Sequence, residues 1–308
     1  MDIFFQILVN VIIPVFFLIG VGAILHRIFN FDINTLSKLN MYLFLPTLCF
    51  VNIYENKIEG DTLLYIFIFL VLQSGVLMIL SAWISKIAKF DSGTTSVFKN
   101  SVVLINSGNF GIPVSQLVFS HNPLGASIQI TVMIFQNLLT YTYGLFNSIS
   151  ADSNNRLKAI VEFLKNPVIY AFILGLGLHA LNVKIPGFIW VPINNISDAF
   201  LAVALITLGV QSAFIKINRF PLPLILSLFG RLILAPAIAL LIIFVLNLEG
   251  TTAQALFIAS SFPTSRNSAL LALEYKNSPE YAAQTVLMST IFSMITVSIV
   301  VYLSTILF

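Results

Sequence analysis

The chain has 308 residues, of which 58% are hydrophobic and 9% are charged, and its formal net charge is +3. Soluble domains carry roughly 25% charged residues, so this composition excludes a soluble globular protein. Apolar runs of about 20 residues recur from end to end, each long enough to cross a bilayer. The alternating segments of a membrane β-barrel are absent from the sequence. We therefore expect an all-α polytopic membrane protein.

Ten transmembrane helices are predicted, the first of them a retained span because no basic residue precedes its apolar run. In chain order they cover residues 4–25, 36–54, 62–85, 94–120, 126–149, 167–182, 194–214, 221–247, 251–274 and 281–306.

The basic residues set the expected orientation. With the N-terminus outside, eleven Lys and Arg residues fall in cytoplasmic loops and two fall outside. The cytoplasmic set is Arg27, Lys38, Lys86, Lys89, Lys99, Arg156, Lys158, Lys165, Lys216, Arg219 and Lys276, and the outer pair is Lys57 and Lys184. This asymmetry follows the positive-inside rule. It predicts a multi-pass protein of the cell membrane with both termini outside the cytoplasm.

A polar segment at 151–166, which we expect to be a cytoplasmic linker with a short amphipathic helix, separates two similar halves, 1–150 and 167–308. Each half holds five predicted spans, and matching features recur in both halves: Gly20-x-Gly22 with Gly175-x-Gly177, Gln129 with Gln284, and Pro113 with Pro263. Because five is an odd number, the second half is inverted in the membrane. Inverted repeats are typical of secondary transporters. We expect the glycines to serve close helix packing.

Spans four and nine are interrupted by polar, proline-containing stretches, "NSGNFGIP" at 106–113 and "SFPTSRN" at 261–267. Proline removes a backbone donor and disrupts the preceding turn. The freed polar groups need protein partners or a water-lined cavity. Two such breaks at corresponding positions of inverted repeats predict a ligand site where the broken helices cross.

The electrostatics predict the sign of the ligand. Pro113 and Pro263 each suit the first position of a new half-helix, so two positive helix ends would meet near mid-membrane. Arg266 adds a full charge there, and Arg binds carboxylates bidentately. The expected substrate is an organic anion. The predicted binding residues are Asn106, Ser107, Gly108, Asn109, Pro113, Pro263, Thr264, Ser265, Arg266 and Asn267.

Alternatives stay open for several of these residues. Arg266 either contacts substrate or pairs with a carboxylate, Asp198 or Glu274, and Arg231 is either a second anion contact or a partner for Asp198. The Asn, Ser and Thr side chains cap the broken ends, bind ligand, or both. Secondary or coupling roles are assigned to Gln129, Gln284, Asp198, Arg231 and Glu274.

The single cysteine, Cys49, excludes a disulfide or a cysteine-based metal site within one chain. The three histidines, His26, His121 and His179, lie far apart at expected span ends. We predict no catalytic residues, no metal, no cofactor and no nucleic-acid partner.

"NSGNFGIPV" (106–114) resembles the fourth-span signature of the auxin efflux carrier family, which includes plant auxin exporters and bacterial malate or malonate permeases. "SFPTSRNSALLALEY" (261–275), "LSKLNMYLFLPTLCF" (36–50) and "DAFLAVALITLGVQ" (198–211) are similar to its ninth, second and seventh spans. The family's crossover residues map onto Asn106, Gly108, Asn109, Pro113 and Pro263. Arg266-Asn267 departs from the small or apolar residues expected in many relatives.

The resemblance implies an inverted-repeat fold related to bile-acid and sodium/proton transporters. Helices 1, 2, 6 and 7 would form a scaffold and a homodimer contact, and helices 3–5 and 8–10 a moving transport domain. The implied function is elevator-type secondary transport of organic anions, either malate- or malonate-like dicarboxylates or auxin-like acids. The alternatives are a substrate-gated channel and a membrane-embedded anion sensor. The coupling ion, H⁺ or Na⁺, stays open.

Overall fold

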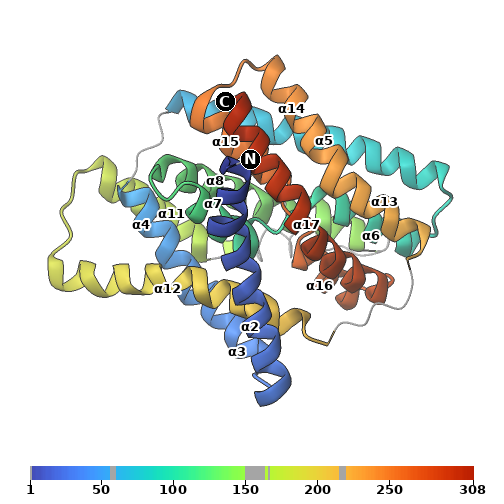
Figure 1. Ribbon diagram of the computed structural model, residues 1–308, viewed down its shortest axis with the longest axis horizontal. Coiled ribbons are helices and arrows are strands. Elements are labelled where there is room, and N and C mark those ends of the chain that lie inside the picture. The colour runs from blue at the N-terminus through green and yellow to red at the C-terminus, as the bar shows by residue number, and fades with distance from the viewer. Residues whose placement is uncertain (1, 56–59, 150–163, 166, 215–219) are drawn as a thin grey trace.

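The computed structural model describes residues 2–55, 60–149, 164–165, 167–214 and 220–308, and this part of the chain is helical apart from turns and one isolated bridge (Figure 1). Six of its helices have the length and apolar composition of membrane spans: Phe5–Phe29, Ile33–Glu55, Gly60–Ile87, Gly187–Ser212, Leu222–Val245 and Pro279–Leu307. The protein is therefore an all-helical, multi-pass membrane protein. Most of the predicted linker, 151–166, lies outside the described residues.

The helices of the first half are α1 (Asp2–Ile7), α2 (Ile13–Phe29), α3 (Ile33–Leu39), α4 (Leu45–Glu55), α5 (Gly60–Ile87), α6 (Ser92–Val103), α7 (Ile112–Val118), α8 (Pro123–Leu139) and α9 (Leu145–Ser148). Those of the second half are α11 (Pro167–Ala180), α12 (Gly187–Ser212), α13 (Leu222–Phe229), α14 (Ala235–Val245), α15 (Gly250–Ser260), α16 (Arg266–Glu274) and α17 (Pro279–Leu307). Short π-helical turns join some of them: η1 (Leu8–Ile12), η2 (Asn40–Phe44), η3 (Ser107–Gly111), η4 (Thr140–Gly144) and η5 (Gly230–Leu234).

Local sequence explains many of the helix ends. Asp32 caps α3 by accepting the amides of Asn34 and Thr35 at 3.1 and 3.2 Å, and Asp91 caps α6 by accepting the amide of Thr94 at 3.0 Å. The predicted start of the seventh span at 194 is wrong, because α12 begins at Gly187. Pro192 lies inside its second turn, where the loss of one hydrogen bond does not end the helix.

Glycines let α2 and α12 pack closely. A Cβ atom on Gly22 would lie 2.1 Å from the carbonyl oxygen of Ile206, and one on Gly209 would lie 1.9 Å from that of Ile19. Gly175 on α11 similarly approaches α4, whereas Gly20 and Gly177 have open space beside them. The packing role predicted for the paired glycines therefore holds for Gly22 and Gly175 only.

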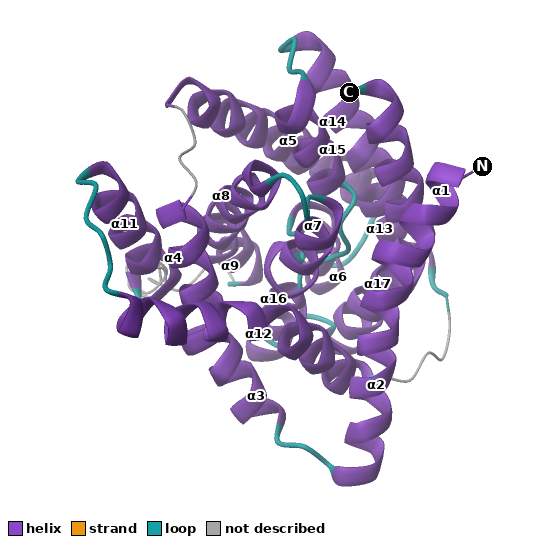
Figure 2. Cartoon of the chain, turned by 60° about the vertical axis from the view of Figure 1, so that its left-hand side comes forward, coloured by secondary structure: helices purple, strands orange, loops and turns teal. Residues whose placement is uncertain are grey.

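The helices form two groups (Figure 1). One group contains α2, α3, α4, α11 and α12, and the other contains α5, α6, α13, α14, α16 and α17. Helix α7 lies between them in the middle of the molecule (Figure 2). Here the predicted breaks of spans four and nine are found, between α6 and α7 and between α15 and α16, surrounded by buried apolar residues such as Phe110 and Phe262.

Candidate functional site

The two interrupted helices cross through a short antiparallel contact. The amide of Asn106 donates to the carbonyl of Pro263 at 2.8 Å, and the amide of Ser265 donates to the carbonyl of Leu104 at 2.8 Å. These bonds enclose the bridge between Ile105 and Thr264. Polar backbone groups freed by each break are thus satisfied by the other break, as a buried site in a membrane protein requires.

Hydrogen bonds with neighbouring helices hold this contact in place. Thr264 donates its hydroxyl to the carbonyl of Ser101 at 2.9 Å and its amide to the hydroxyl oxygen of Ser289 at 3.1 Å. The amide of Ile105 donates to Oε1 of Gln136 at 3.3 Å. Gln129, a predicted secondary residue, donates Nε2 to the carbonyl of Ser107 at 2.9 Å. This hydrogen bond supports the crossover backbone.

Gly111 allows the close approach of the two breaks. A Cβ atom there would lie 2.6 Å from Nε2 of Gln129 and 2.7 Å from the Phe262 ring. Any larger residue at this position would push the supporting glutamine or the second break away. Gln284, the expected counterpart of Gln129, is half-buried on α17 and does not line the cavity described below.

The helices restart differently from the prediction. Pro113 does lie in the first turn of α7, after the π-helical turn that begins at Ser107. Pro263 does not begin a helix, so the assignment of a first helical position to it is wrong. Its carbonyl takes part in the antiparallel contact, and α16 begins at Arg266, capped by Ser265, whose hydroxyl accepts the Asn267 amide at 3.2 Å.

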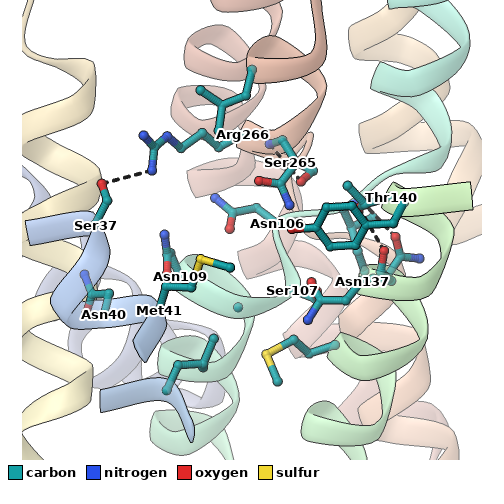
Figure 3. A pocket seen from close by; sticks show the side chains of 18 of the residues that line it. Ser37, Asn40, Met41, Asn106, Ser107, Asn109, Asn137, Thr140, Ser265 and Arg266 are labelled. Carbon is teal, nitrogen blue, oxygen red and sulfur yellow. Dashed lines mark hydrogen bonds between the residues drawn. The ribbon is translucent and has the colours of Figure 1, made fainter. Parts of the chain in front are cut away.

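A cavity of about 280 Å³ lies beside the crossover. Seven of the ten predicted binding residues line it, namely Asn106, Ser107, Gly108, Asn109, Ser265, Arg266 and Asn267. Figure 3 labels five of them: Asn106, Ser107, Asn109, Ser265 and Arg266. The other three, Pro113, Pro263 and Thr264, are buried behind this surface. Of these, Thr264 uses its hydroxyl to hold the crossover, as described above.

The opposite walls consist of residues that sequence reasoning did not predict, although Gln129, on α8, was among the predicted secondary residues. The α3–α4 segment contributes Asn34, Ser37, Lys38, Asn40, Met41 and Leu45, and the α8–η4 segment contributes Met133, Gln136, Asn137, Thr140 and Tyr141. The available signal was the presence of polar residues within apolar spans. Ser37, Lys38 and Asn40 fall within one turn, and Gln136, Asn137 and Thr140 are spaced for one helix face.

Arg266 reaches across the cavity from α16 to α3 (Figure 3). Its Nη1 atom donates to the hydroxyl oxygen of Ser37 at 3.2 Å. Glu274 is at the other end of α16, about 12 Å along the helix axis from Arg266. Asp198 is exposed on α12, where Glu55 is its electrostatic neighbour. Neither carboxylate lines the cavity, and the side-chain contact of Arg266 is the serine hydroxyl.

Arg231 also differs from both of its predicted roles. It is 1% exposed, and its guanidinium donates to the backbone carbonyls of Val102, at 2.8 Å, and Ser260. Arg231 does not line the cavity of about 280 Å³, and its hydrogen-bond partners do not include Asp198. Arg231 thus binds the ends of α6 and α15, the two helices that stop at the crossover.

Two polar atoms on the cavity residues lack hydrogen-bond partners: Nδ2 of Asn106 and Oδ1 of Asn40. Both side chains are buried, and an unsatisfied buried polar group costs about 1–3 kcal/mol. A ligand or water in the cavity would satisfy them.

Within the described ranges, no group of three His, Cys, Asp or Glu side chains is placed to hold a metal ion. Cys49 is buried, with its sulfur 3.8 Å from the Val168 carbonyl.

Comparison with known proteins finds similarity to one family of membrane transport proteins and to several uncharacterized transporters. A family model described as membrane transport protein matches residues 7–301. A protein of Methanothermobacter thermautotrophicus, named uncharacterized transporter, is 26% identical over 86% of this chain and 86% of its own length. The uncharacterized transporter MJ1031 of Methanocaldococcus jannaschii is 26% identical over 86% of this chain and 87% of its own length. The uncharacterized transporter YfdV of Escherichia coli K12 is 25% identical over 64% of both chains.

Proposed function

We propose that this chain, which belongs to the membrane transport protein family, is a secondary active transporter of small organic dianions. Its membership confirms the resemblance to auxin efflux carriers. The observation that carries the substrate proposal is the charge of the cavity: Arg266 and Lys38 both line it, and none of its lining residues in the described part of the chain is Asp or Glu.

The two cations belong to different walls of the cavity. Arg266 begins α16, where the helix dipole adds to its positive charge. Lys38 is on α3, next to the serine that Arg266 contacts. A dicarboxylate of malonate or malate size would place one carboxylate on the Arg266 fork, which binds carboxylates bidentately, and the second on the Lys38 ammonium. A monocarboxylate would use one cation only.

The neutral lining residues complete the site. Asn106, Asn109, Asn137 and Asn267 present amide groups that can donate to carboxylate oxygens or accept from a substrate hydroxyl. The cavity volume of about 280 Å³ is at the lower end for small-molecule sites, which span roughly 300–1,000 Å³. This size favours a short dicarboxylate over an indole-bearing acid.

The proposed mechanism is an elevator with ten spans in two inverted repeats. The group containing α2, α4, α11 and α12 is the scaffold and homodimer contact, and the helices around the crossover form the moving unit. The contact between Arg266 and Ser37 spans these two units. Asn34 and Lys38 line the cavity and are exposed, on the side of the protein that faces the cytoplasm if both termini lie outside, so the proposed state is one open to the cytoplasm.

The test is uptake of radiolabelled malonate, malate, acetate and lactate by purified protein in proteoliposomes, with H⁺ and Na⁺ gradients imposed separately to identify the coupling ion. Saturable uptake of the dicarboxylates is expected. Arg266→Gln should weaken their apparent affinity by about 10- to 100-fold, the equivalent of 1.4–2.8 kcal/mol for a charge-assisted contact.

The matched control is Arg27→Gln. Arg27 also donates to a carbonyl, that of Ala213, at 3.1 and 2.9 Å, but it does not line the cavity. This control should keep wild-type affinity. Uptake confined to cationic or neutral solutes would exclude the proposal, as would ion currents that do not saturate with substrate. Binding without any movement of substrate would indicate a sensor instead.

A further inference from the structure

The crossover has two electrically different sides. The helices that restart after the breaks, beginning at Ser107 and Arg266, place their amino ends at the anion cavity. The helices that stop at the breaks, α6 and α15, place their carboxyl ends at Arg231. Carboxyl ends carry the negative end of the helix dipole and unpaired carbonyls. A cation at that position is favoured by both.

Arg231 is built into this position. It is carried by the π-helical turn η5 between α13 and α14, and its guanidinium bonds one carbonyl on each stopped helix. In the described part of the chain, the guanidinium of Arg231 pairs with these two carbonyls and not with a carboxylate. One side chain therefore ties together α6 and α15, which are 129 and 29 residues away in sequence.

The third nitrogen of the guanidinium, Nε, carries an N–H group without a protein partner in the described part of the chain. Arg231 lines a second, much smaller cavity of about 10 Å³ together with Gln73, Ser74 and Gln136. That volume is about the size required for one water molecule. Ile105 of the crossover and Gln136 of α8 line both cavities, so these two residues separate the anion site from the Arg231 site.

We propose that Arg231 is a positioning residue that acts as a resident cation: it neutralises the carboxyl ends of both stopped helices, with one water on Nε, and thereby holds the crossover in the shape that binds the anion. The crossover carbonyls of Val102, Ser260, Leu104 and Pro263, which a metal cation would otherwise use, all accept hydrogen bonds from the protein. The guanidinium takes the position of such an ion. The transport arm of this proposal depends on the proposed function, whereas its structural arm does not.

The structural arm is measured by hydrogen–deuterium exchange on the purified protein. Arg231→Met removes the charge at similar length, and Arg231→Lys keeps the charge with a different donor geometry. Arg27→Met is the control, since Arg27 bonds the carbonyl of Ala213 away from the crossover. We expect faster exchange of the Asn106 and Ser265 amides by about tenfold or more in Arg231→Met, an intermediate effect in Arg231→Lys, and none in Arg27→Met. Unchanged exchange at these amides in both Arg231 variants overturns the proposal.

The functional arm compares anion affinity, using radiolabelled malonate as the probe. Arg231→Met should bind malonate about tenfold more weakly or worse, with Arg231→Lys between it and the wild type. If Arg231→Met does not yield folded protein, Arg231→Lys carries the test, and wild-type affinity together with wild-type exchange in that variant overturns the proposal. Replacing Na⁺ by choline should leave malonate affinity of the wild type unchanged, and an Na⁺-dependent affinity would also overturn it.

The two proposals fail separately. If wild-type protein binds no dicarboxylate but the Arg231 variants still loosen the crossover amides, the proposed substrate is wrong and the role of Arg231 stands. If malonate binds and Arg266→Gln weakens binding as expected, but Arg231→Met leaves the affinity and the exchange unchanged, the anion site stands and the role of Arg231 is wrong.

Discussion

The guanidinium of Arg266 donates to the hydroxyl oxygen of Ser37, 229 residues away in sequence and 3.2 Å away in space. The bond closes one side of the anion cavity and joins the helix that follows the second break to α3 (Figure 3). Ser37 also accepts from Nε2 of Gln211 at 3.2 Å. A ligand that binds the Arg266 fork fully has to compete with this serine.

Ser37→Ala should therefore bind dicarboxylate more tightly than the wild type, by about two- to tenfold, because no hydrogen bond to Arg266 has to be broken first. Equilibrium binding of radiolabelled malonate measures the change. Ser212→Ala is the control, since that hydroxyl donates within its own helix to the carbonyl of Leu208. Weaker binding in Ser37→Ala would instead mean that the serine holds Arg266 in its ligand-binding position.

Lys38→Gln should discriminate between substrates. The loss of the second cation removes one of the two charge contacts of a dicarboxylate, so malonate affinity should fall by about tenfold. Acetate, which engages Arg266 alone, should compete almost as well as before. Competition curves against both anions give the ratio directly. Equal losses for malonate and acetate would place both ligands on Lys38 and contradict the two-cation arrangement.

Thr264→Val should destabilise the crossover. The variant keeps the volume but leaves the buried carbonyl of Ser101 without the hydroxyl that it accepts at 2.9 Å, at a cost of about 1–3 kcal/mol. The midpoint of thermal unfolding in detergent should drop, and malonate affinity should fall with it. Thr305→Val, at an exposed position near the C-terminus, should leave both measurements unchanged. A wild-type midpoint for Thr264→Val would show that another donor replaces the threonine.

The α2–α12 contact can be tested with two glycines on the same helix. Gly22→Ala places a Cβ atom 2.1 Å from the carbonyl oxygen of Ile206, whereas Gly20→Ala meets nothing within 4 Å. Overpacking against backbone costs about 1–3 kcal/mol or more, so Gly22→Ala should unfold at a lower temperature. Gly20→Ala should be neutral or stabilising, because alanine is the better helix former. Equal midpoints for the two variants would argue against this helix contact.

The cap of α6 predicts a dependence on pH. Hydrogen bonds from the side chain and amide of Thr94 lower the pKa of Asp91 from its ordinary value. A carboxylate with a lowered pKa stabilises the fold above its unfolded pKa of about 3.9, and this contribution is lost as the pH falls through the folded-state pKa. Asp91→Ala should therefore unfold at a lower temperature than the wild type at neutral pH, and the gap should close in acid.

Asp91→Asn is the matched control for this prediction, because asparagine caps helices but does not titrate. Its difference from Asp91→Ala should persist at every pH. A gap between wild type and Asp91→Ala that stays constant down to about pH 3 would show that the carboxylate charge does not contribute to the cap.

The sequence by itself determined the features that depend on local chemistry. Apolar composition required membrane helices, proline and glycine marked where two of them break, and Arg266 beside the second break indicated an anion site. Seven of the ten predicted binding residues line the cavity because they are consecutive with the breaks themselves. Polarity at a helix break can be seen in sequence without knowledge of what packs beside it.

Only the tertiary structure decided which groups satisfy one another. Pro263 lies before α16 rather than in its first turn, and its carbonyl accepts the amide of Asn106 from the other half of the chain. Arg231 binds carbonyls rather than an anion or Asp198 because the ends of α6 and α15 converge on it, and Lys38 and Ser37 join the site because α3 packs opposite α16. In a membrane, each buried polar group takes the partner that packing places within reach, and that choice depends on residues far away in the sequence.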